Sequence, residues 1–292
     1  MQELFSTFKN GEVKLVDSYD SEKSSFSDFI RDSNALSIEL QTYDLLREKI
    51  KDNYYEVSIN PFYVTGFYEK TDLVEHDFVN EHIDDCYYTE CKGICVDFNF
   101  ARDYQLEELI ELGRSFSRKE YDCNVKKPIP VILGAAYSSA YKIGEIFSGE
   151  YIIEQPLTFV VIGFFKENAV VEIANIEYNL ANYIMLPSLS IDNVQDEKEK
   201  IILLSTQIEG FVHYDTPIDY QNVATQINEI ASTTGFQYIH VESASDYMGK
   251  QNYSLEQSRW KYIVSAIFLI SWSTLSVVIL LYWRRRENGI SE

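Results

Sequence analysis

Four cysteines and one histidine have the spacing that metal binding, disulfide formation or thiol chemistry would require. Cys86, Cys91 and Cys95 lie in the segment DDCYYTECKGICVDF, and Cys123 follows later in the chain. In an exported domain, an even set of cysteines predicts up to two disulfide bonds, in any of three pairings. The alternatives are unpaired thiols, or a zinc site completed by Cys123 or His82, although the sequence contains no paired C-x2-C knuckle.

No pattern in the sequence predicts an enzyme. The nucleophile elbow G-x-S-x-G, the phosphate-binding loop G-x4-G-K-S/T and the zinc helix H-E-x-x-H do not occur. His82 stands beside Asp84, Asp85 and Cys86, where an imidazole could activate the thiol, but the other cysteines favour a structural role. The 46 carboxylates are too many for an acid–base pair to stand out. We therefore expect no catalytic residue, no cofactor and no bound metal.

The charge balance argues against nucleic acid as a partner. The chain has 25 Lys and Arg against 46 Asp and Glu, for a formal net charge of −21. A surface of this charge repels the phosphates of nucleic acids and of anionic lipids.

One uncharged segment, from Ile263 to Trp283, is long enough to cross the hydrocarbon core of a bilayer as a helix. Aromatic residues flank it on both sides, and the run from Arg284 to Arg286 follows. The positive-inside rule then predicts a single-pass protein of the cell membrane, with a cytoplasmic C-terminus and an extracytoplasmic acidic domain. The N-terminal sequence MQELFSTFKNGEVKL has no signal-peptide pattern. We therefore expect either an upstream membrane segment missing from this chain or a tail-anchored cytosolic domain.

The apolar spacing predicts an α+β domain whose two ends form one layer. The elements expected at the ends are a helix over 36–52, a strand over 54–67, a strand over 199–208, a helix over 217–232 and a strand over 235–243. The middle is expected to be mainly strands, over 94–100, 129–134, 150–154, 157–165, 169–176 and 182–187, with a helix over 103–116.

The stretch from Glu111 to Pro187 carries a series of signals in a fixed order: LGRSFSRKEY, KPIPVILGAAYSSAYKIGEIFSG, LTFVVIGFFKENA and NYIMLPS. This order resembles the extracellular domain of MacB/FtsX-like ABC-transporter permeases. The matching positions are Gly113, Arg114 and Phe116 in a turn, Pro130 to Gly134 in a strand, Ala136 to Tyr141 in a helix, Lys142 to Gly144 in a turn, Phe159 to Phe165 including Gly163, and Ile184 to Pro187.

The resemblance implies a porter-like α/β layer with an inserted β-rich subdomain. The expected parts are an N-terminal segment 1–34, the porter-like subdomain 35–93 and 191–245, the inserted subdomain 94–190, a stalk helix 246–262, the transmembrane helix 263–283 and the tail 284–292. The stalk and the transmembrane helix would form one continuous rod. The family has three further membrane helices, so this chain looks like a truncated or split permease.

The same resemblance implies the partners and the role. A separate ABC ATPase subunit would drive the membrane helices, other permease helices or subunits would accompany this chain in the lipid bilayer, and the outer domain would respond in export or signalling. The alternative is a tail-anchored acidic binding protein without a transport role.

The four glycines of the motif also have a physical interpretation that needs no family. Gly113, Gly134, Gly144 and Gly163 predict backbone turns or close approaches between strands. We expect Arg114 to cap the carbonyls at the end of the predicted helix rather than to bind an anion.

Overall fold

The first layer of the domain is a four-stranded antiparallel sheet assembled from distant parts of the chain. Its strand order is β16-β1-β15-β2. The strands are β1 (Gly11–Asp17), β2 (Tyr54–Tyr55), β15 (Phe211–Tyr214) and β16 (Ile239–Ser243). The computed structural model describes residues 11–17, 25–65, 81–83, 86–173, 176–214, 217–236 and 239–243, all within one compact unit. The predicted stalk, membrane segment and tail lie outside these residues.

Three helices accompany this sheet: α3 (Ala35–Lys49), α5 (Glu197–Ile208) and α6 (Pro217–Thr234). A short helix, α2 (Ser25–Phe29), precedes them. Their apolar faces meet the sheet in one buried cluster that includes Leu15, Leu46, Val212 and Ile227. The predicted helices over 36–52 and 217–232 are confirmed as α3 and α6, and α6 begins at the proline expected to open it.

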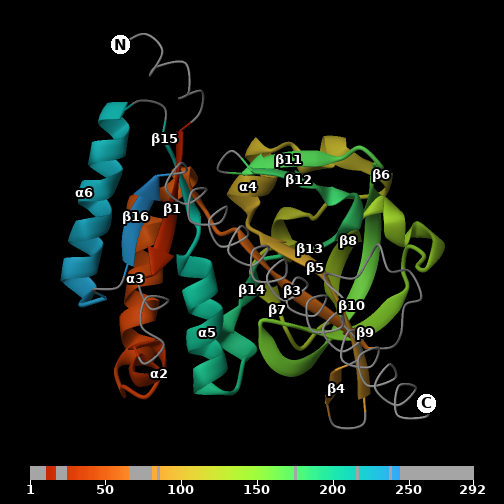
Figure 1. The fold of residues 1–292 in the computed structure, drawn as a ribbon, viewed down its shortest axis with the longest axis horizontal. Helices are drawn as coiled ribbons and strands as arrows, with labels where there is room; N and C mark the ends of the chain where they lie inside the picture. Colours follow the sequence, from red (N-terminus) through yellow and green to blue (C-terminus); the bar gives the residue numbers. More distant parts are fainter. Residues whose placement is uncertain are drawn as a thin grey trace, which may run out of the picture. The chain divides into compact units, whose positions relative to one another are not determined.

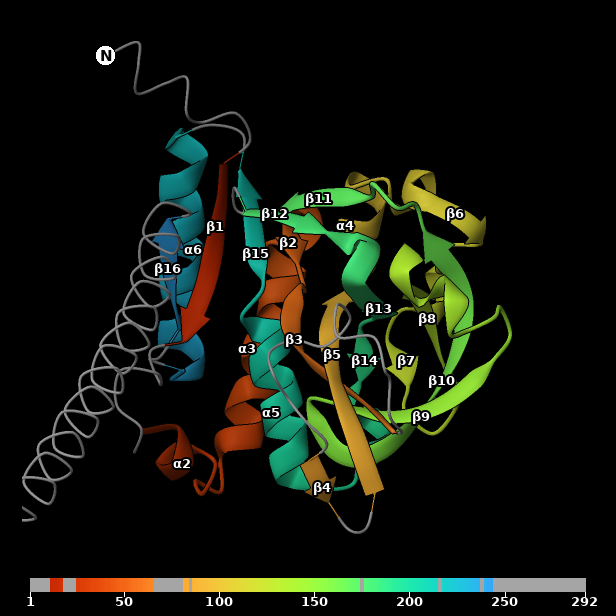
Figure 2. The same cartoon turned by 45° about the vertical axis from the view of Figure 1, so that its right-hand side comes forward.

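Helix α5 replaces the strand that we expected over 199–208. The Asp196 side chain caps it, accepting hydrogen bonds from the backbone N–H groups of Lys198 at 2.8 Å and Glu199 at 3.1 Å. Leu203 packs into the core of the second module, whereas Leu204 packs into the cluster of the first layer. The helix lies between the two modules (Figures 1 and 2) and is buried on two sides, which explains its continuous apolar run.

The second module is a β-barrel. Its sheet has the order β13-β8-β10-β9-β3-β5-β4, and an additional β13–β5 pairing closes the ring. The ring strands are β3 (Ser58–Thr65), β5 (Cys86–Val96), β8 (Ile129–Leu133), β9 (Ile146–Tyr151), β10 (Ile153–Phe165) and β13 (Tyr183–Pro187). The pairs β10–β8 and β13–β5 are parallel. Phe62, Val131, Phe159 and Leu186 belong to the core cluster of this module.

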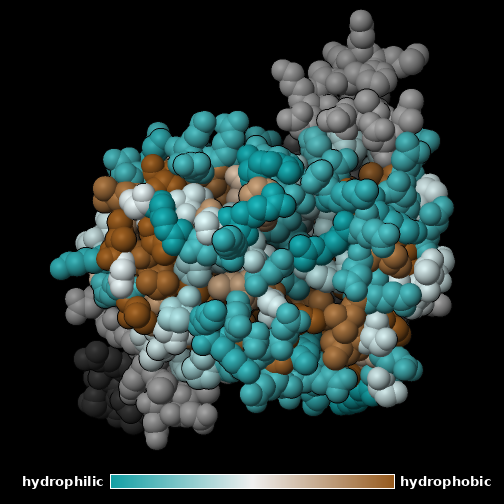
Figure 3. Space-filling model, turned by 180° about the vertical axis from the view of Figure 1, so that it is seen from behind, coloured by the Kyte–Doolittle hydropathy of each residue, from teal (hydrophilic) through white to brown (hydrophobic). Residues whose placement is uncertain are grey.

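Smaller elements lie on the outside of the barrel. They are β4 (Glu81–Ile83), α4 (Phe98–Asp103), β6 (Ile110–Gly113), β7 (Cys123–Asn124), the pair β11 (Val170–Ile173) and β12 (Ile176–Asn179), and β14 (Leu189–Ser190), which pairs with β7. Figure 3 shows exposed apolar side chains gathered on the barrel side of the unit. Among the residues that the structure describes, Leu112, Ile143 and Ile146 are the most exposed large apolar residues, at 57%, 50% and 60%.

Several expectations about this module are wrong. The strand predicted over 94–100 ends at Val96, where β5 ends, and α4 begins at Phe98. The helix predicted over 103–116 does not form: α4 ends at Asp103, Gln105 has a left-handed backbone with φ 51°, a short 3-10 turn follows over Leu106–Leu109, and β6 then pairs with β10. The change of sheet also occurs earlier than expected. Tyr55 ends β2 in the first sheet and Ser58 begins β3 in the barrel, so the barrel includes residues that we had placed in 35–93. Strand β1 likewise places part of the segment 1–34 in the first layer.

No helix within the described ranges is long and apolar enough to cross a membrane.

Candidate functional site

The passage of the chain from the first sheet to the barrel coincides with a polar cavity of about 380 Å³. Glu56 and Val57 connect β2 to the first barrel strand, β3, and Glu56 forms part of the cavity floor. The cavity is lined by Arg47, Lys51, Asp52, Tyr54, Glu56, Asp97, Phe98, Asn99, Arg118, Tyr121, Asp122 and Ser188. We call this set the junction cavity.

Glu56 is a carboxyl group almost completely removed from water. Its side chain is 3% exposed, and Oε1 lies 3.4 Å from Nε of Arg47. Oε2 is buried and has no hydrogen-bond partner in the described part of the chain. Burial raises the pKa of Glu56 to about 8, nearby Asp97 raises it further, and Arg47 opposes the shift. Much of the population therefore holds a proton on this group at neutral pH.

Asp97 is the second buried carboxyl group of the floor. It caps α4, where Oδ1 accepts a hydrogen bond of 2.9 Å from the backbone N–H of Phe100. Burial raises its pKa to about 6, while the hydrogen bond from Phe100 lowers it. The junction cavity thus contains two carboxyl groups that burial keeps partly protonated near neutral pH.

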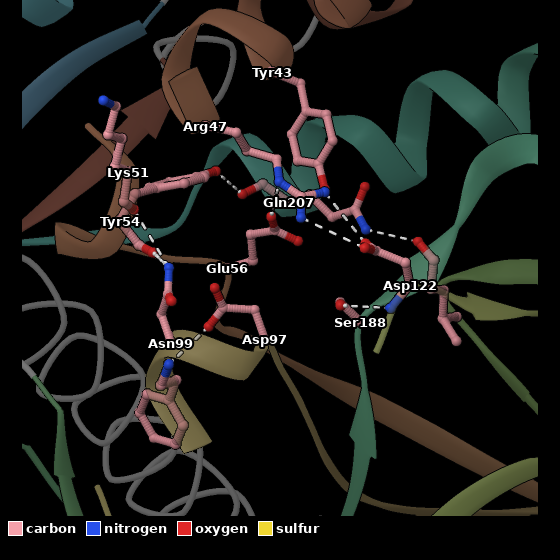
Figure 4. Close-up of polar contacts among 12 residues, drawn as sticks. Tyr43, Arg47, Lys51, Tyr54, Glu56, Asp97, Asn99, Asp122, Ser188 and Gln207 are labelled. Atoms are coloured by element: carbon pink, nitrogen blue, oxygen red, sulfur yellow. Dashed lines mark hydrogen bonds and ion pairs between the residues drawn. The ribbon is translucent and has the colours of Figure 1, made fainter. Parts of the chain in front are cut away.

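Arg47 connects the first layer to the barrel. From α3 its Nη1 donates to the hydroxyl of Tyr43 at 2.9 Å and to Oδ1 of Asp122 at 3.2 Å, and Nη2 lies 3.5 Å from Oδ2 of Asp122. Asp122 precedes β7, and its backbone N–H donates to Oγ of Ser188 at 3.3 Å. A single guanidinium group is therefore shared by Glu56 and Asp122, which belong to different segments (Figure 4).

Neutral hydrogen bonds complete the connection between the modules. The Tyr54 hydroxyl donates to the backbone carbonyl of Gln207 in α5, and Nε2 of Gln207 donates to the carbonyl of Leu189 at 2.8 Å. Nδ2 of Asn99 donates to the carbonyl of Tyr54 at 3.2 Å. Because most of these groups are buried, their bonds fix the relative position of the layer and the barrel (Figure 4).

The rim of the cavity contains strained backbone and an aromatic wall. Lys51 and Asp122 have left-handed backbones, with φ of 53° and 56°. The guanidinium of Arg118 stacks over Phe98, 4.3 Å from the ring centroid, and Phe98 packs edge-on against Tyr121. Non-glycine residues rarely adopt this conformation, and they occur most often where the surrounding structure enforces it.

The predicted motif residues do not line the junction cavity. Gly113 and Gly163 are register partners in the β6–β10 pair, and a Cβ on Gly113 would lie 2.3 Å from the carbonyl oxygen of Ile162. A Cβ on Gly134 would lie 2.1 Å from the carbonyl oxygen of Ala181. Gly144 has φ +83° and open space around it. Phe116 is buried, and Pro187 ends β13, opposite Val96 of β5.

Arg114 has a different role from the two that we weighed. It forms a two-pronged ion pair with Glu120, at 2.7 Å and 2.6 Å, and Nη1 also donates to the carbonyl of Ser115 at 3.0 Å. The helix whose end it would have capped is absent at this position. The ion pair lowers the pKa of Glu120 to about 2.

The cysteines cannot form the two disulfides that we considered. Cys86, Cys91 and Cys95 all belong to β5, whose register with β3 is regular from Tyr88 to Cys95. At about 3.3 Å per residue, four or five residues along a strand separate two Cα atoms by roughly 13–17 Å. A disulfide requires less than about 7 Å. Any disulfide within the chain must therefore join Cys123 to one cysteine of β5.

Cys95 and Cys123 are present as thiols. Cys95 is buried and donates to the carbonyl of Pro187 at 3.4 Å, while Cys123 pairs in register with Leu189. Burial raises the pKa of both thiols, that of Cys123 to about 11, which disfavours a reactive thiolate. Within the described ranges, no three His, Cys, Asp or Glu side chains lie close enough together to hold a metal ion. The side chains of His82 and Cys86 lie outside these ranges.

The residues of the junction cavity were missed by sequence reasoning. Glu56 follows the paired tyrosines Tyr54 and Tyr55, and a carboxylate inside such an apolar run was the one available signal. The residues that meet it, Arg47, Asp97 and Asp122, come from three separate segments.

No protein-family model matches the sequence, and no curated protein matches it. Several solved structures are similar to the chain, including the following two. One is the extracellular domain of the noncanonic ABC-type transporter YknZ from Gram-positive bacteria, with 11% identity, a TM-score of 0.41, and coverage of 79% of this chain and 99% of that structure. The other is the periplasmic region of MacB from Actinobacillus actinomycetemcomitans, with 10% identity, a TM-score of 0.41, and coverage of 82% and 92%. The first structure is part of an ABC-type transporter, and the second is part of MacB, the protein after which the resemblance is named. Similarity at this level assigns no activity, partner or topology to the chain.

Proposed function

We propose that this chain is the extracytoplasmic domain and adjoining membrane helix of a MacB/FtsX-like ABC-transporter permease, with no active site of its own. The observation that carries the proposal is the organisation of the chain. One layer is built from both ends of the domain, and a barrel formed by the motif-bearing segment is inserted between them. This organisation agrees with what the motif order from Glu111 to Pro187 implied.

In this proposal the first layer receives motion from the membrane segment. The last described strand, β16, is at the edge of the first sheet and precedes the uncharged segment 263–283 in sequence. It pairs with β1, which pairs with β15. A pull on β16 would thus act on the whole sheet, and a separate ATPase subunit would be its source.

The junction cavity would transmit this motion to the barrel. Arg47, Glu56 and Asp122 join α3, the linker between sheets and the segment before β7. Arg47 and Asp122 are about half exposed and Glu56 is buried, and charge-assisted contacts of this kind have strict geometry, so they resist sliding of one module over the other. The barrel would follow the layer as one body, and the outer surface would move in export or signalling.

The test is co-purification from the cells that naturally produce the chain. The full chain, tagged at its C-terminus, would be extracted in mild detergent, and the bound proteins would be identified by mass spectrometry. The proposal predicts a stoichiometric partner with an ATP-binding G-x4-G-K-S/T loop, together with ATP hydrolysis that vanadate inhibits.

A variant that lacks residues 263–283 serves as the control and should lose this partner. Absence of any ATPase from the intact chain, combined with a soluble cytosolic partner, would contradict the proposal. That result would favour a tail-anchored binding protein.

A further inference from the structure

The floor of the junction cavity contains a buried carboxyl oxygen without a hydrogen-bond partner among the described residues. The atom is Oε2 of Glu56. The Glu56 side chain lines the cavity and is only 3% exposed. Leaving a buried polar atom without a partner costs stability, so proteins rarely do it away from functional sites.

The floor also has too little positive charge for its carboxyl groups. Glu56 and Asp97 are both buried, and Arg47 is the cation nearest to Glu56. Arg47 is already bound to Asp122 and to the Tyr43 hydroxyl. A second cation at the floor would allow both carboxyl groups to ionise in a buried site.

At the rim, by contrast, two cations form no ion pair within the described ranges. Arg118 stacks on Phe98, and no carboxylate within the described ranges forms an ion pair with it. Lys51 on the same rim also lacks an ion pair in this part of the chain, whereas the rim carboxylates Asp52 and Asp122 pair with Arg102 and Arg47. An anionic group is therefore favoured at the rim.

We propose that the junction cavity binds a zwitterionic ligand the size of an amino acid or dipeptide. Its ammonium group would donate to Glu56 and Asp97, and its carboxylate would meet Arg118. The volume of about 380 Å³ lies within the range of small-molecule sites, and the rings of Phe98 and Tyr121 provide an apolar wall.

The experiment is a binding screen on the full chain in detergent, with the twenty free L-amino acids and their homodipeptides as probes. Saturation-transfer NMR would identify binders, and calorimetry would give their affinities. We expect at least one probe to bind, and its N-acetyl and amide derivatives to bind at least about tenfold more weakly, because each lacks one charge.

Protons provide a second readout. At pH 7 an ammonium group that ionises Glu56 displaces its proton, so calorimetry in two buffers of different ionisation enthalpy should show release of up to about one proton per ligand. The charged or titratable groups around Glu56 that contribute to this balance are Tyr43, Arg47, Tyr54, Asp97 and Asp122.

Two variants and one control complete the test. Glu56→Gln and Arg118→Ala should each weaken binding at least about tenfold, and Glu56→Gln should abolish the proton release. Arg31→Ala, at an exposed ion pair outside the cavity, should leave both unchanged. The inference is overturned if no probe binds below about 10 mM, or if a probe binds equally well to folded Glu56→Gln.

Discussion

The substitution Glu56→Gln is expected to change how the stability of the domain depends on pH. Burial raises the pKa of this carboxyl from its ordinary 4.5 to about 8. Between these two values the folded chain holds a proton that the unfolded chain has released. The free energy of unfolding therefore falls as the pH rises through this window, and the loss is complete above the folded-state pKa.

The size of this effect follows from the difference between the two pKa values. A difference of this size corresponds to about 3–5 kcal/mol of stability lost between pH 5 and pH 9. Glutamine keeps the shape of the protonated carboxyl but cannot ionise. The variant should match the unmodified chain within about 1 kcal/mol at pH 5 and exceed it by about 3 kcal/mol at pH 9.

Urea unfolding of the full chain in detergent, followed by circular dichroism at pH 5, 7 and 9, measures this difference. Asp97, whose pKa is raised to about 6, contributes a similar fall to both proteins. Asp28→Asn serves as the control, because Asp28 is 71% exposed and pairs with Arg31 on the surface. Parallel pH curves for Glu56→Gln and the unmodified chain would refute the reasoning.

Three further predictions concern backbone geometry and the thiols. Lys51→Gly should be about 1 kcal/mol more stable than Lys51→Ala in thermal unfolding. Both variants remove the same charge, but only glycine adopts the left-handed conformation of residue 51 without strain. Equal stabilities would show that the strain is absent. Gly134→Ala should lower the free energy of unfolding by more than about 2 kcal/mol, because the new Cβ would overlap the backbone of Ala181. Gly144→Ala should lower it by about 1 kcal/mol, because only the positive φ opposes alanine there. The reverse order in chemical unfolding would contradict the glycine geometry. Peptide mapping of oxidised protein should find Cys123 in any intramolecular disulfide. Cys95 is the favoured partner, because Cys95 contacts Pro187 and Cys123 pairs with Leu189, two residues further along the chain. A bond between two cysteines of β5 would contradict the extended strand.

Periodic segments could be predicted from sequence where one face of an element is buried. Helices α3 and α6 have apolar residues at helical spacing, and both were found where expected. The strands over 129–134 and 157–165 were also found, as β8 and β10.

Elements buried on two sides could not be predicted in the same way. Helix α5 sends Leu203 to the barrel and Leu204 to the first layer, so its apolar residues do not form the single stripe that would reveal a helix. The segment after Gln105 was wrongly predicted as a helix for a different reason. Its apolar spacing fitted a helix, but pairing with β10 is a contact between distant residues that a local pattern does not contain.

The junction cavity could not be located from local pattern because its members are far apart in the chain. Arg47 and Asp122 are 75 residues apart, and the pair becomes visible only when α3 packs beside the barrel. The motif glycines were recognisable because a glycine inside a strand pattern has few explanations. A buried glutamate among 46 carboxylates has no comparable signature in sequence.

The central claim is that the acidic domain lies outside the cell membrane, and cysteine labelling tests it most directly. Asn168 is exposed in the turn between β10 and β11, and Ser291 lies in the predicted cytoplasmic tail. In intact cells that naturally produce the chain, a membrane-impermeant maleimide should label Asn168→Cys and should label Ser291→Cys only after permeabilisation, each measured above the unmodified chain. Labelling of Ser291→Cys in intact cells, with Asn168→Cys protected until permeabilisation, would place the domain in the cytosol and contradict the account.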